Sequence, residues 1–217
     1  MALKKKGLND CLIQHKAAVQ NRPNDWQIRF QYAAFLNSGL HNIKAEEEQL
    51  RKVIKICPYY SAYLNLGINL HKQGKINESE SVLRYLLEIN PNAVWAHIEL
   101  ASICRQRREY MQEIQHLLHA LSLEPKSLIE VHLDLARAYE KIRNPDKAID
   151  VLNNAVRVFP EEETANVHAL MSYFLYGRGE YTEALKEIQH AFRIDPTLKN
   201  NSSYNTLLHN LENMLSR

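Results

Sequence analysis

Three histidines, His97, His132 and His168, recur at one place in successive segments of the chain. Repeated imidazoles suggest a metal site or a pH sensor, because imidazole nitrogen is a common metal ligand and titrates near neutral pH. Zinc needs ligand nitrogens that converge to about 2.0–2.1 Å from the ion. Equivalent side chains on parallel helices about 8–10 Å apart point the same way and do not converge. We therefore expect packing histidines and predict no metal.

Other residues that could carry chemistry are isolated. His116 and His119 share a helical face, but no carboxylate or cysteine is placed to complete a metal site with them. The sequence contains no nucleophile motif, no Gly-rich phosphate loop and no paired carboxylates, and its turns are too short to build a pocket. We predict a protein that is not an enzyme and has no cofactor.

The cysteines indicate a compartment. Cys11, Cys57 and Cys104 are odd in number, widely spaced and on predicted apolar helix faces. This pattern favours buried free thiols in a reducing environment over a disulfide framework. No stretch approaches the ~18 apolar residues of a membrane span, and polar residues interrupt the run that a signal peptide would need. We expect a cytoplasmic protein that no membrane segment anchors.

Charge is balanced along the chain. The 27 basic and 25 acidic residues are interleaved and leave a formal net charge of +2. Such a distribution gives no electrostatic footprint for nucleic acid or for an anionic membrane. Lys4, Lys5 and Lys6 form the only basic tripeptide, which we interpret as part of a flexible N-terminal tail.

The helices that must position any site are marked in the sequence by prolines at their ends. Apolar runs with helical periodicity each end at a proline, and these prolines recur at intervals of 33 to 36 residues: Pro23, Pro58, Pro91, Pro125, Pro160 and Pro196. Repetition at this period predicts a stack of units, none of which can bury its apolar face alone. Strand signals are absent, so the predicted fold class is all-α.

Each unit reads as two antiparallel helices with a fixed packing pattern. The predicted first helices carry a small residue near their middle, at Ala34, Gly67, Ala101, Ala136 and Ser172. The second helices carry a large residue and, three positions later, another apolar residue: Leu50 and Val53, Leu83 and Leu86, Leu117 and Ala120, Leu152 and Ala155, Ile188 and Ala191. A small residue opposite a large one lets two helices approach closely.

Polar residues at the predicted helix starts suggest caps. Asn77 with Glu80 resembles a capping box, Asn144 precedes Pro145 at a first helical position, and Thr182 could cap the last second helix.

The predicted boundaries cover one domain, 1–217. An N-terminal half-repeat or cap helix spans 9–23, five repeats span 27–58, 60–91, 94–125, 129–160 and 165–196, and a C-terminal capping helix spans 203–216. Terminal units of such arrays commonly depart from the pattern because they must present a polar outer face. The half-repeat also fits a chain cut from a longer array.

The order of these residues resembles the tetratricopeptide repeat. Tyr63, Leu66, Gly67, Leu70, Gly74, Ser79, Leu83, Leu86 and Pro91 follow that motif, as do matching residues of 129–160 and 165–196. The resemblance implies a right-handed α-α superhelix of antiparallel helix pairs. The first repeat departs from the motif, because Asn37 and Glu46 replace a bulky and a small residue. RNA-binding pentatricopeptide repeats have a neighbouring period, but balanced charge and the closing Asn/Glu/Asp-Pro pairs favour the tetratricopeptide class.

The resemblance also implies that first helices line a concave groove. Read onto this chain, the second, fifth, ninth and twelfth places of each first helix give a groove whose main candidates are Phe35, Leu64, Ile68, Trp95, Ile98, Arg105, Leu133, Arg137, Tyr173 and Tyr176. Aromatic and arginine anchors of this kind suit a peptide or an amphipathic helix. The competing interpretation is that Trp95 and Tyr173 only pack between neighbouring helices.

One specific pocket of this family is missing. A clamp for acidic C-terminal tails of heat-shock chaperones needs lysines, asparagines and an arginine on three first helices, whereas the matching places hold Gln31, Phe35, Trp95 and Glu99. An acidic Glu99 would repel such a tail. We predict a scaffold that binds a peptide or helix of another protein; the alternative is the substrate-recruiting segment of a larger enzyme such as a glycosyltransferase. No oligomeric state is predicted.

Overall fold

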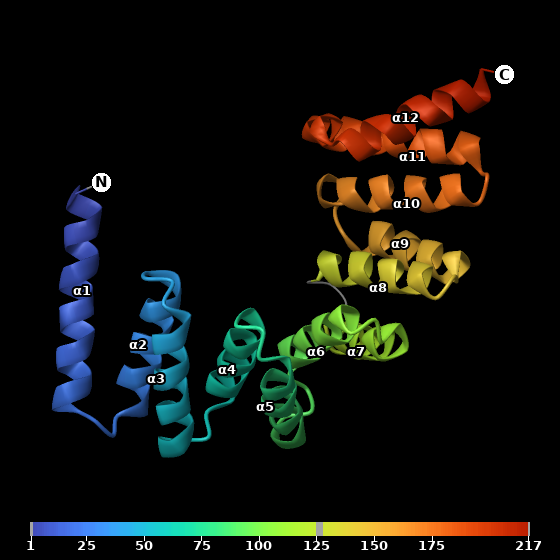
Figure 1. Ribbon diagram of the computed structural model, residues 1–217. Coiled ribbons are helices and arrows are strands. Elements are labelled where there is room, and N and C mark those ends of the chain that lie inside the picture. Colours follow the sequence, from blue (N-terminus) through green and yellow to red (C-terminus); the bar gives the residue numbers. More distant parts are fainter. Residues whose placement is uncertain (1, 125–127, 217) are drawn as a thin grey trace. The chain divides into compact units, whose positions relative to one another are not determined.

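The computed structural model describes residues 2–124 and 128–216, and within these residues the chain is helical without a strand (Figure 1). The helices are α1 (Ala2–Asn21), α2 (Trp26–Ser38), α3 (Ile43–Ile56), α4 (Tyr60–Lys72), α5 (Ile76–Ile89), α6 (Val94–Gln106), α7 (Tyr110–Leu123), α8 (Ile129–Lys141), α9 (Pro145–Val158), α10 (Ala165–Gly177), α11 (Tyr181–Ile194) and α12 (Ser202–Leu215), with short 3-10 helices η1 (Glu161–Glu163) and η2 (Pro196–Asn200). The all-α prediction is confirmed. Pro125 lies outside the described residues.

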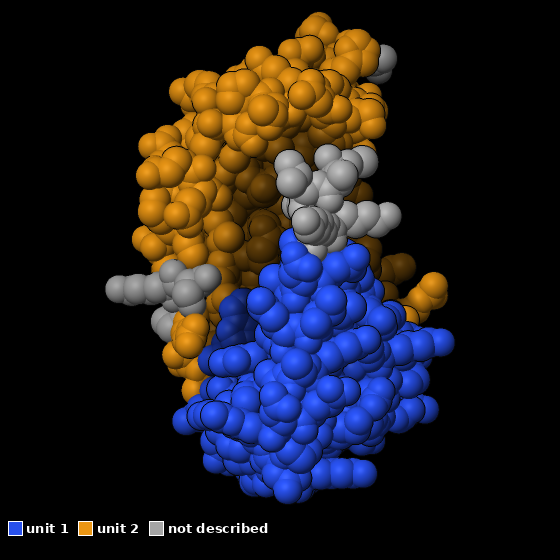
Figure 2. All heavy atoms as spheres, turned by 90° about the vertical axis from the view of Figure 1, so that its left-hand side faces the viewer, with its two compact units in different colours: residues 1–103 blue, residues 104–217 orange. Residues whose placement is uncertain are grey.

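The chain divides into two compact units, Met1–Ile103 and Cys104–Arg217, called unit 1 and unit 2 below (Figure 2). Consecutive helices pack as pairs within each unit: α2 with α3 and α4 with α5 in unit 1, and α8 with α9 and α10 with α11 in unit 2. The first member of a pair is called its first helix and the other its second helix, and by the order of the repeats in the sequence α6 counts as a first helix and α7 as a second helix.

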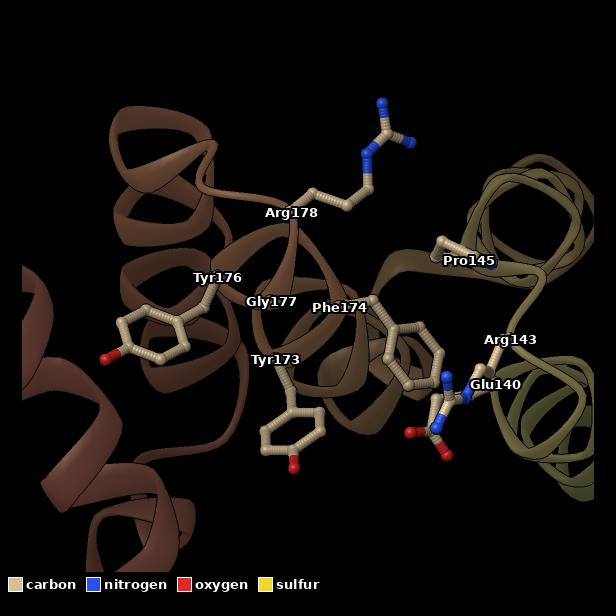
Figure 3. Close-up of a pocket in the computed structure, with 8 residues that line it drawn as sticks. All are labelled: Glu140, Arg143, Pro145, Tyr173, Phe174, Tyr176, Gly177 and Arg178. Atoms are coloured by element: carbon tan, nitrogen blue, oxygen red, sulfur yellow. The ribbon is translucent and has the colours of Figure 1, made fainter.

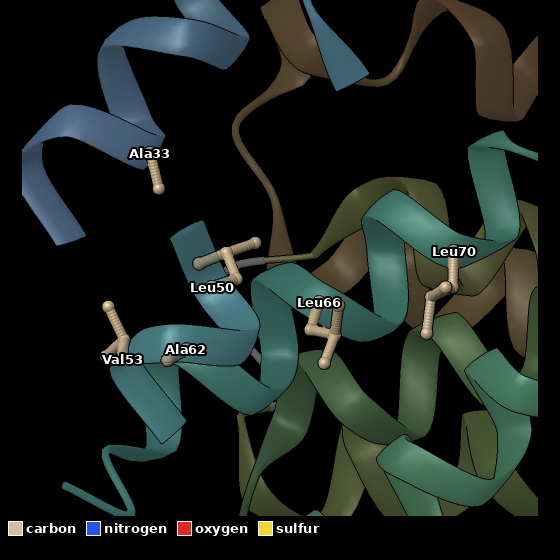
Figure 4. Packing of buried hydrophobic residues seen from close by; sticks show 6 residues of the cluster. All are labelled: Ala33, Leu50, Val53, Ala62, Leu66 and Leu70. Carbon is tan, nitrogen blue, oxygen red and sulfur yellow. The ribbon is translucent and has the colours of Figure 1, made fainter. Parts of the chain in front are cut away.

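The core of unit 1 follows the predicted pattern of small and large residues. Leu50 and Val53 of α3 are fully buried, and they form one cluster with Ala33, Ala62, Leu66 and Leu70 (Figure 4). Burial of side chains such as Leu50 stabilises the fold by about 1.5–3 kcal/mol each. The small residue of α2 is Ala33, which is 1% exposed, whereas the predicted Ala34 is exposed. The alignment of the first repeat was therefore wrong by one residue.

Gly67 shows why one position must be small. A Cβ atom added there would lie 2.5 Å from Leu83 Cδ2, closer than real Cβ contacts. Leu83 of α5 is itself fully buried, so it has no room to retreat. A hydrogen bond from the second helix also joins the two helices at this point: Ser79 Oγ donates to the Gly67 carbonyl at 2.7 Å. In unit 2, Ser172 Oγ donates to the Ala184 carbonyl at the same distance of 2.7 Å.

The two residues predicted as departures in the first repeat are partners of each other. Asn37 Nδ2 donates to Glu46 Oε1 at 2.9 Å, and Asn69 Nδ2 donates to Glu46 Oε2 at 2.8 Å. Glu46 is only 2% exposed, and burial raises its pKa although both amide bonds oppose the rise. A buried carboxyl is tolerated when its oxygens are bonded. With the first repeat shifted by one residue, Leu36 occupies the bulky place and is 2% exposed, so Asn37 is no departure there, and its amide instead helps to satisfy the buried Glu46.

Five of the turns between consecutive helices each contain a residue in the left-handed region. These residues are His41, Gly74, Arg108, Arg143 and Gly179, with φ of 51°, 75°, 63°, 58° and 81°. Glycine adopts this conformation without a Cβ clash, whereas other residues pay a steric penalty. Two of the five turns therefore use the favoured residue and three do not.

The predicted caps are partly correct. Asn144 caps α9 by accepting from the Lys147 N–H at 3.2 Å, with Pro145 in the first turn. The predicted caps at Asn77 and Thr182 are wrong, because α5 begins at Ile76 after Lys75 and α11 begins at Tyr181 after Glu180. Both residues therefore lie inside the first helical turn, where they cannot act as the N-cap.

The N-terminal end of the chain differs from the prediction, whereas the C-terminal end agrees with it. α1 begins at Ala2, so the segment with Lys4 to Lys6 is helical instead of a flexible tail, and Cys11 is exposed, contrary to the predicted buried thiol. Cys57 is half-buried and Cys104 is buried. At the other end, α12 packs on α11 and buries Leu207 and Leu211. Among the described helices, none is both long and apolar enough to cross a membrane.

Candidate partner-binding surface

The three repeated histidines are interior packing residues, as predicted. His97, His132 and His168 are 9%, 1% and 8% exposed. The His132 Nδ1–H donates to the Leu128 carbonyl at 3.2 Å, and burial lowers the pKa of this imidazole. His168 Nδ1 lies 2.5 Å from Glu187 Oε2. No group of three or more potential metal ligands occurs among residues 2–124 and 128–216 whose side chains are described.

In unit 1 the predicted groove residues differ in how much surface they offer. Trp95, near the start of α6, is 56% exposed and is the largest open side chain of the set. Leu64 packs at the edge of the cluster formed by Leu83, Leu86, Ala96, Leu100 and Ile103, so it is mainly a core residue. Ile68 and Ile98 are half-buried. Trp95 is therefore the candidate contact of this unit.

Phe35 lies elsewhere than the groove alignment placed it. Its ring stacks on His15 of α1, with centroids 4.9 Å apart. The register error at Ala33 explains this, since the positions equivalent to Leu64 and His71 are then Phe30 and Asn37. Phe35 therefore joins α2 to the N-terminal helix. We correct the prediction by removing Phe35 from the groove residues.

Charged first-helix residues in unit 2 are already paired. The Arg105 guanidinium contacts Glu113 Oε1 and Asp134 Oδ2, both at 2.6 Å, and Asp134 Oδ1 also accepts from Arg137 Nη1 at 3.2 Å. Burial raises the pKa of Glu113, and Arg105 offsets part of that rise. The predicted site residues Arg105 and Arg137 thus belong to one small network that is nearly neutral.

Leu133 cannot serve a partner as predicted. It lies on α8 but is only 2% exposed. The same burial that stabilises unit 2 leaves no side-chain surface for a ligand. We remove it from the candidate contacts of this first helix.

The structure brings Tyr173 and Tyr176 together at one cavity of about 520 Å³ (Figure 3). We call this the Tyr173 cavity; it is lined by Glu140, Arg143, Pro145, Tyr173, Phe174, Tyr176, Gly177 and Arg178. Tyr173 is 57% exposed although it is aromatic, and the Tyr176 ring lies 5.6 Å from that of Tyr181. A cavity of this size is in the range that holds small ligands or peptide side chains.

Some charged side chains that line the Tyr173 cavity form ion pairs and one does not. Arg178 forms ion pairs with Asp146 at 2.9 Å and Glu180 at 2.6 Å. Glu140 pairs with the neighbouring Lys141 at 3.1 Å. The Arg143 backbone N–H donates to the Glu140 carbonyl at 2.9 Å, whereas the Arg143 guanidinium forms no hydrogen bond or ion pair with another residue that the structure describes. The cavity therefore presents aromatic walls and one arginine without a carboxylate.

The sequence alone did not single out Arg143, Arg178 or Phe174. A signal for Arg143 exists, because the turn residues Gly74 and Gly179 occupy the same place after the closing helix residues. Aligning these glycines would have placed Arg143 in a left-handed turn. That its side chain borders a cavity depends on the packing of α10, which a single sequence does not reveal.

Comparisons with known proteins agree with the helix pairs. Residues 60–93 and 129–170 match family models described as tetratricopeptide repeat. Anaphase-promoting complex subunit 3 of Schizosaccharomyces pombe is 25% identical over 189 residues, a match that covers 84% of this chain and 28% of that protein. The chain thus spans little more than a quarter of the length of this relative.

Solved structures show the same fold. The Cut9–Hcn1 hetero-tetramer of APC/C gives a TM-score of 0.69 at 18% identity, covering 94% of this chain and 39% of the other. YrrB, described as a TPR protein with an unusual peptide-binding site, gives 0.69 at 14% identity, covering 91% and 97%. At these identities the likeness concerns the fold.

Proposed function

Because the chain contains tetratricopeptide repeats, we propose that it is a non-enzymatic scaffold that binds a peptide or helix of a partner protein on its first helices. The groove is the concave face that the repeat family implies. The observation that supports this most is the exposure of aromatic side chains on first helices, at 56% for Trp95 and 57% for Tyr173.

Large exposed aromatic side chains on first helices are candidates for contact with a partner. Aromatic rings contribute most of the energy at many protein interfaces, about 2 kcal/mol or more for a central one. Neither Trp95 nor Tyr173 fills the cores of the two units. Their surface is therefore available for a partner without loss of internal packing.

The relatives point in the same direction. The similar proteins include a subunit of the anaphase-promoting complex and a structure whose title reports peptide binding. Both are associated with other proteins or peptides by their printed descriptions. We infer a partner of protein type for this chain and place it in the cytoplasm, with no role for nucleic acid or a membrane.

A peptide selected from a random displayed library on the full chain tests the proposal. We expect the dissociation constant of that peptide to rise at least about tenfold in the double variant Trp95→Ala/Tyr173→Ala. Tyr85→Ala is the matched control, because Tyr85 is 44% exposed but lies on the second helix α5. Unchanged affinity in the double variant, with helicity intact by circular dichroism, would reject the first-helix surface.

The alternative of a recruiting segment within a larger enzyme remains a prediction. An antibody raised against the chain would separate the two proposals in extracts of the native cell. A band near the 25.3 kDa of this chain supports the separate scaffold. A much larger band that carries catalytic activity into the immunoprecipitate supports the enzyme.

A further inference from the structure

We propose that the Tyr173 cavity binds an acidic side chain of an extended peptide together with the apolar side chain beside it. The inference rests on the proposed function and specifies the chemistry of the partner at one place. It is carried by the lining of the cavity within unit 2, where aromatic walls meet Arg143, whose guanidinium has no ion-pair partner among the side chains that the structure describes.

The apolar part of the site comes from α10. The Phe174 ring is nearly buried and turns toward Glu140 and Arg143, whereas Tyr173 and Tyr176 are directed away from it on the same helix (Figure 3). Tyr173 both lines the cavity and is 57% exposed, so the cavity opens onto the predicted binding face. An apolar side chain placed there would be covered by rings.

The charged part of the site favours an anion. Arg143 can form a two-pronged bond with a carboxylate without breaking an existing ion pair. Arg178 would have to release Asp146 or Glu180 to do the same. A cationic side chain would meet two arginines, and Glu140, the one acidic lining residue, already faces Lys141.

The backbone fixes the place from which the Arg143 side chain starts. Arg143 has φ of 58° in the turn between α8 and α9, a conformation that glycine adopts at Gly74 and Gly179. Its Cα is therefore held at the rim by two helices.

We commit to a side-chain carboxylate instead of a chain end, because Tyr173 both lines the cavity and is 57% exposed, so that a side chain of a peptide lying on the exposed face can reach the cavity. The probes are fluorescent, N-acetylated and C-amidated peptide pools with a central Glu–Phe, Gln–Phe or Lys–Phe pair between randomised residues. A fourth pool carries Gln–Phe at a free C-terminus. Binding to the full chain is measured by fluorescence anisotropy.

We expect the Glu–Phe pool to bind about five- to tenfold more tightly than the Gln–Phe pool, as for one charge-assisted bond at a partly exposed site. Arg143→Asn should abolish this preference, since Asn tolerates the left-handed turn and lacks the charge. Arg143→Lys should restore part of it, and Glu140→Gln should increase it by removing a nearby negative charge. Arg108→Asn is the matched control, because Arg108 has φ of 63° in the preceding turn.

Equal binding of the Glu–Phe and Gln–Phe pools would overturn the inference. If binding of these pools still depends on Tyr173, the proposed function stands and only the preference for an acid fails. Tighter binding of the free C-terminus than of the Glu–Phe pool would show a chain-end site and reject our version. Absence of Glu–Phe binding also rejects it, whatever peptide the random library yields.

Discussion

Glu113 on α7 and Glu47 on α3 are acidic residues beside arginines, and their surroundings shift their pKa values in opposite directions. Burial raises the pKa of Glu113, which is 1% exposed, and one of its oxygens, Oε2, has no hydrogen-bond partner among the described residues. Burial also acts to raise the pKa of Glu47, but hydrogen bonds from Lys75, Arg51 and Gln73 outweigh it and lower the value to about 2. The two residues therefore predict opposite effects of acid on stability.

A pH series on Glu113→Gln and Glu47→Gln tests this contrast. For Glu113 the folded state holds the proton more firmly, so its contribution to the unfolding free energy rises as the pH falls from above its folded pKa towards 4.5. For Glu47 the contribution, about 1–2 kcal/mol after solvent screening, is present above 4.5 and is lost as the pH falls toward 2. The measurement is urea unfolding of each variant against the parent chain. Parallel pH curves for the two variants would contradict the assigned surroundings.

Arg143 predicts a gain of stability on substitution. Arg143→Gly should raise the free energy of unfolding by about 0.5–1 kcal/mol, because φ of 58° costs a residue with a Cβ atom more than it costs glycine. The urea midpoint measures the change. The same variant should lose the preference for acidic peptides. A stability loss would show that the arginine side chain supports the fold, which would remove the binding argument.

At the scale of elements, the close contact of α4 with α5 makes a sharp prediction. Gly67→Ala should lower the unfolding free energy by about 1–3 kcal/mol, since the new Cβ would overlap Leu83 in a packed core. Gly177→Ala is the control, because a Cβ there meets nothing within 4 Å. Thermal unfolding of both variants compares them directly. Equal midpoints would mean that the pair of helices can separate without cost.

The helix pairs were predictable because their signals are local. Each signal lies within a single repeat: the closing prolines, the large residues from Leu50 to Ile188 and the glycine turns. The large residues are buried as expected. The first repeat failed by one residue because Ala33 and Ala34 are both small, so composition could not choose between them. The caps at Asn77 and Thr182 failed because the turn lengths, set by left-handed residues, moved each helix start upstream.

The candidate site was less predictable than the fold. Trp95 and Tyr173, at a second and a ninth place of their first helices, are exposed, but Leu133, at a fifth place that was also assigned to the groove, is buried. Whether such a side chain is covered depends on contacts between helices far apart in sequence. The ion pairs of Arg105 with Glu113 and Asp134 likewise join three helices, so the sequence of any one helix does not predict them.

At the scale of the whole molecule, the binding surface should be separable from the folded core. Because Trp95 and Tyr173 are both more than half exposed, the double alanine variant should keep its unfolding free energy within about 1 kcal/mol of the parent chain. Urea unfolding followed by circular dichroism checks this. A large loss would indicate that the rings pack structurally, which is the competing interpretation of these residues.

The central claim is that a protein partner lies on the first helices. A photo-crosslinking amino acid placed singly at Tyr173, Trp95 and Leu118 of the full chain, followed by irradiation with the library-selected peptide, tests it most directly. Leu118 is 46% exposed on the second helix α7 and serves as the reference position. We expect crosslinked peptide at Tyr173, at Trp95 or at each of them, and none above background at Leu118. Crosslinks at Leu118 alone would place the partner on the second helices and contradict the proposed function.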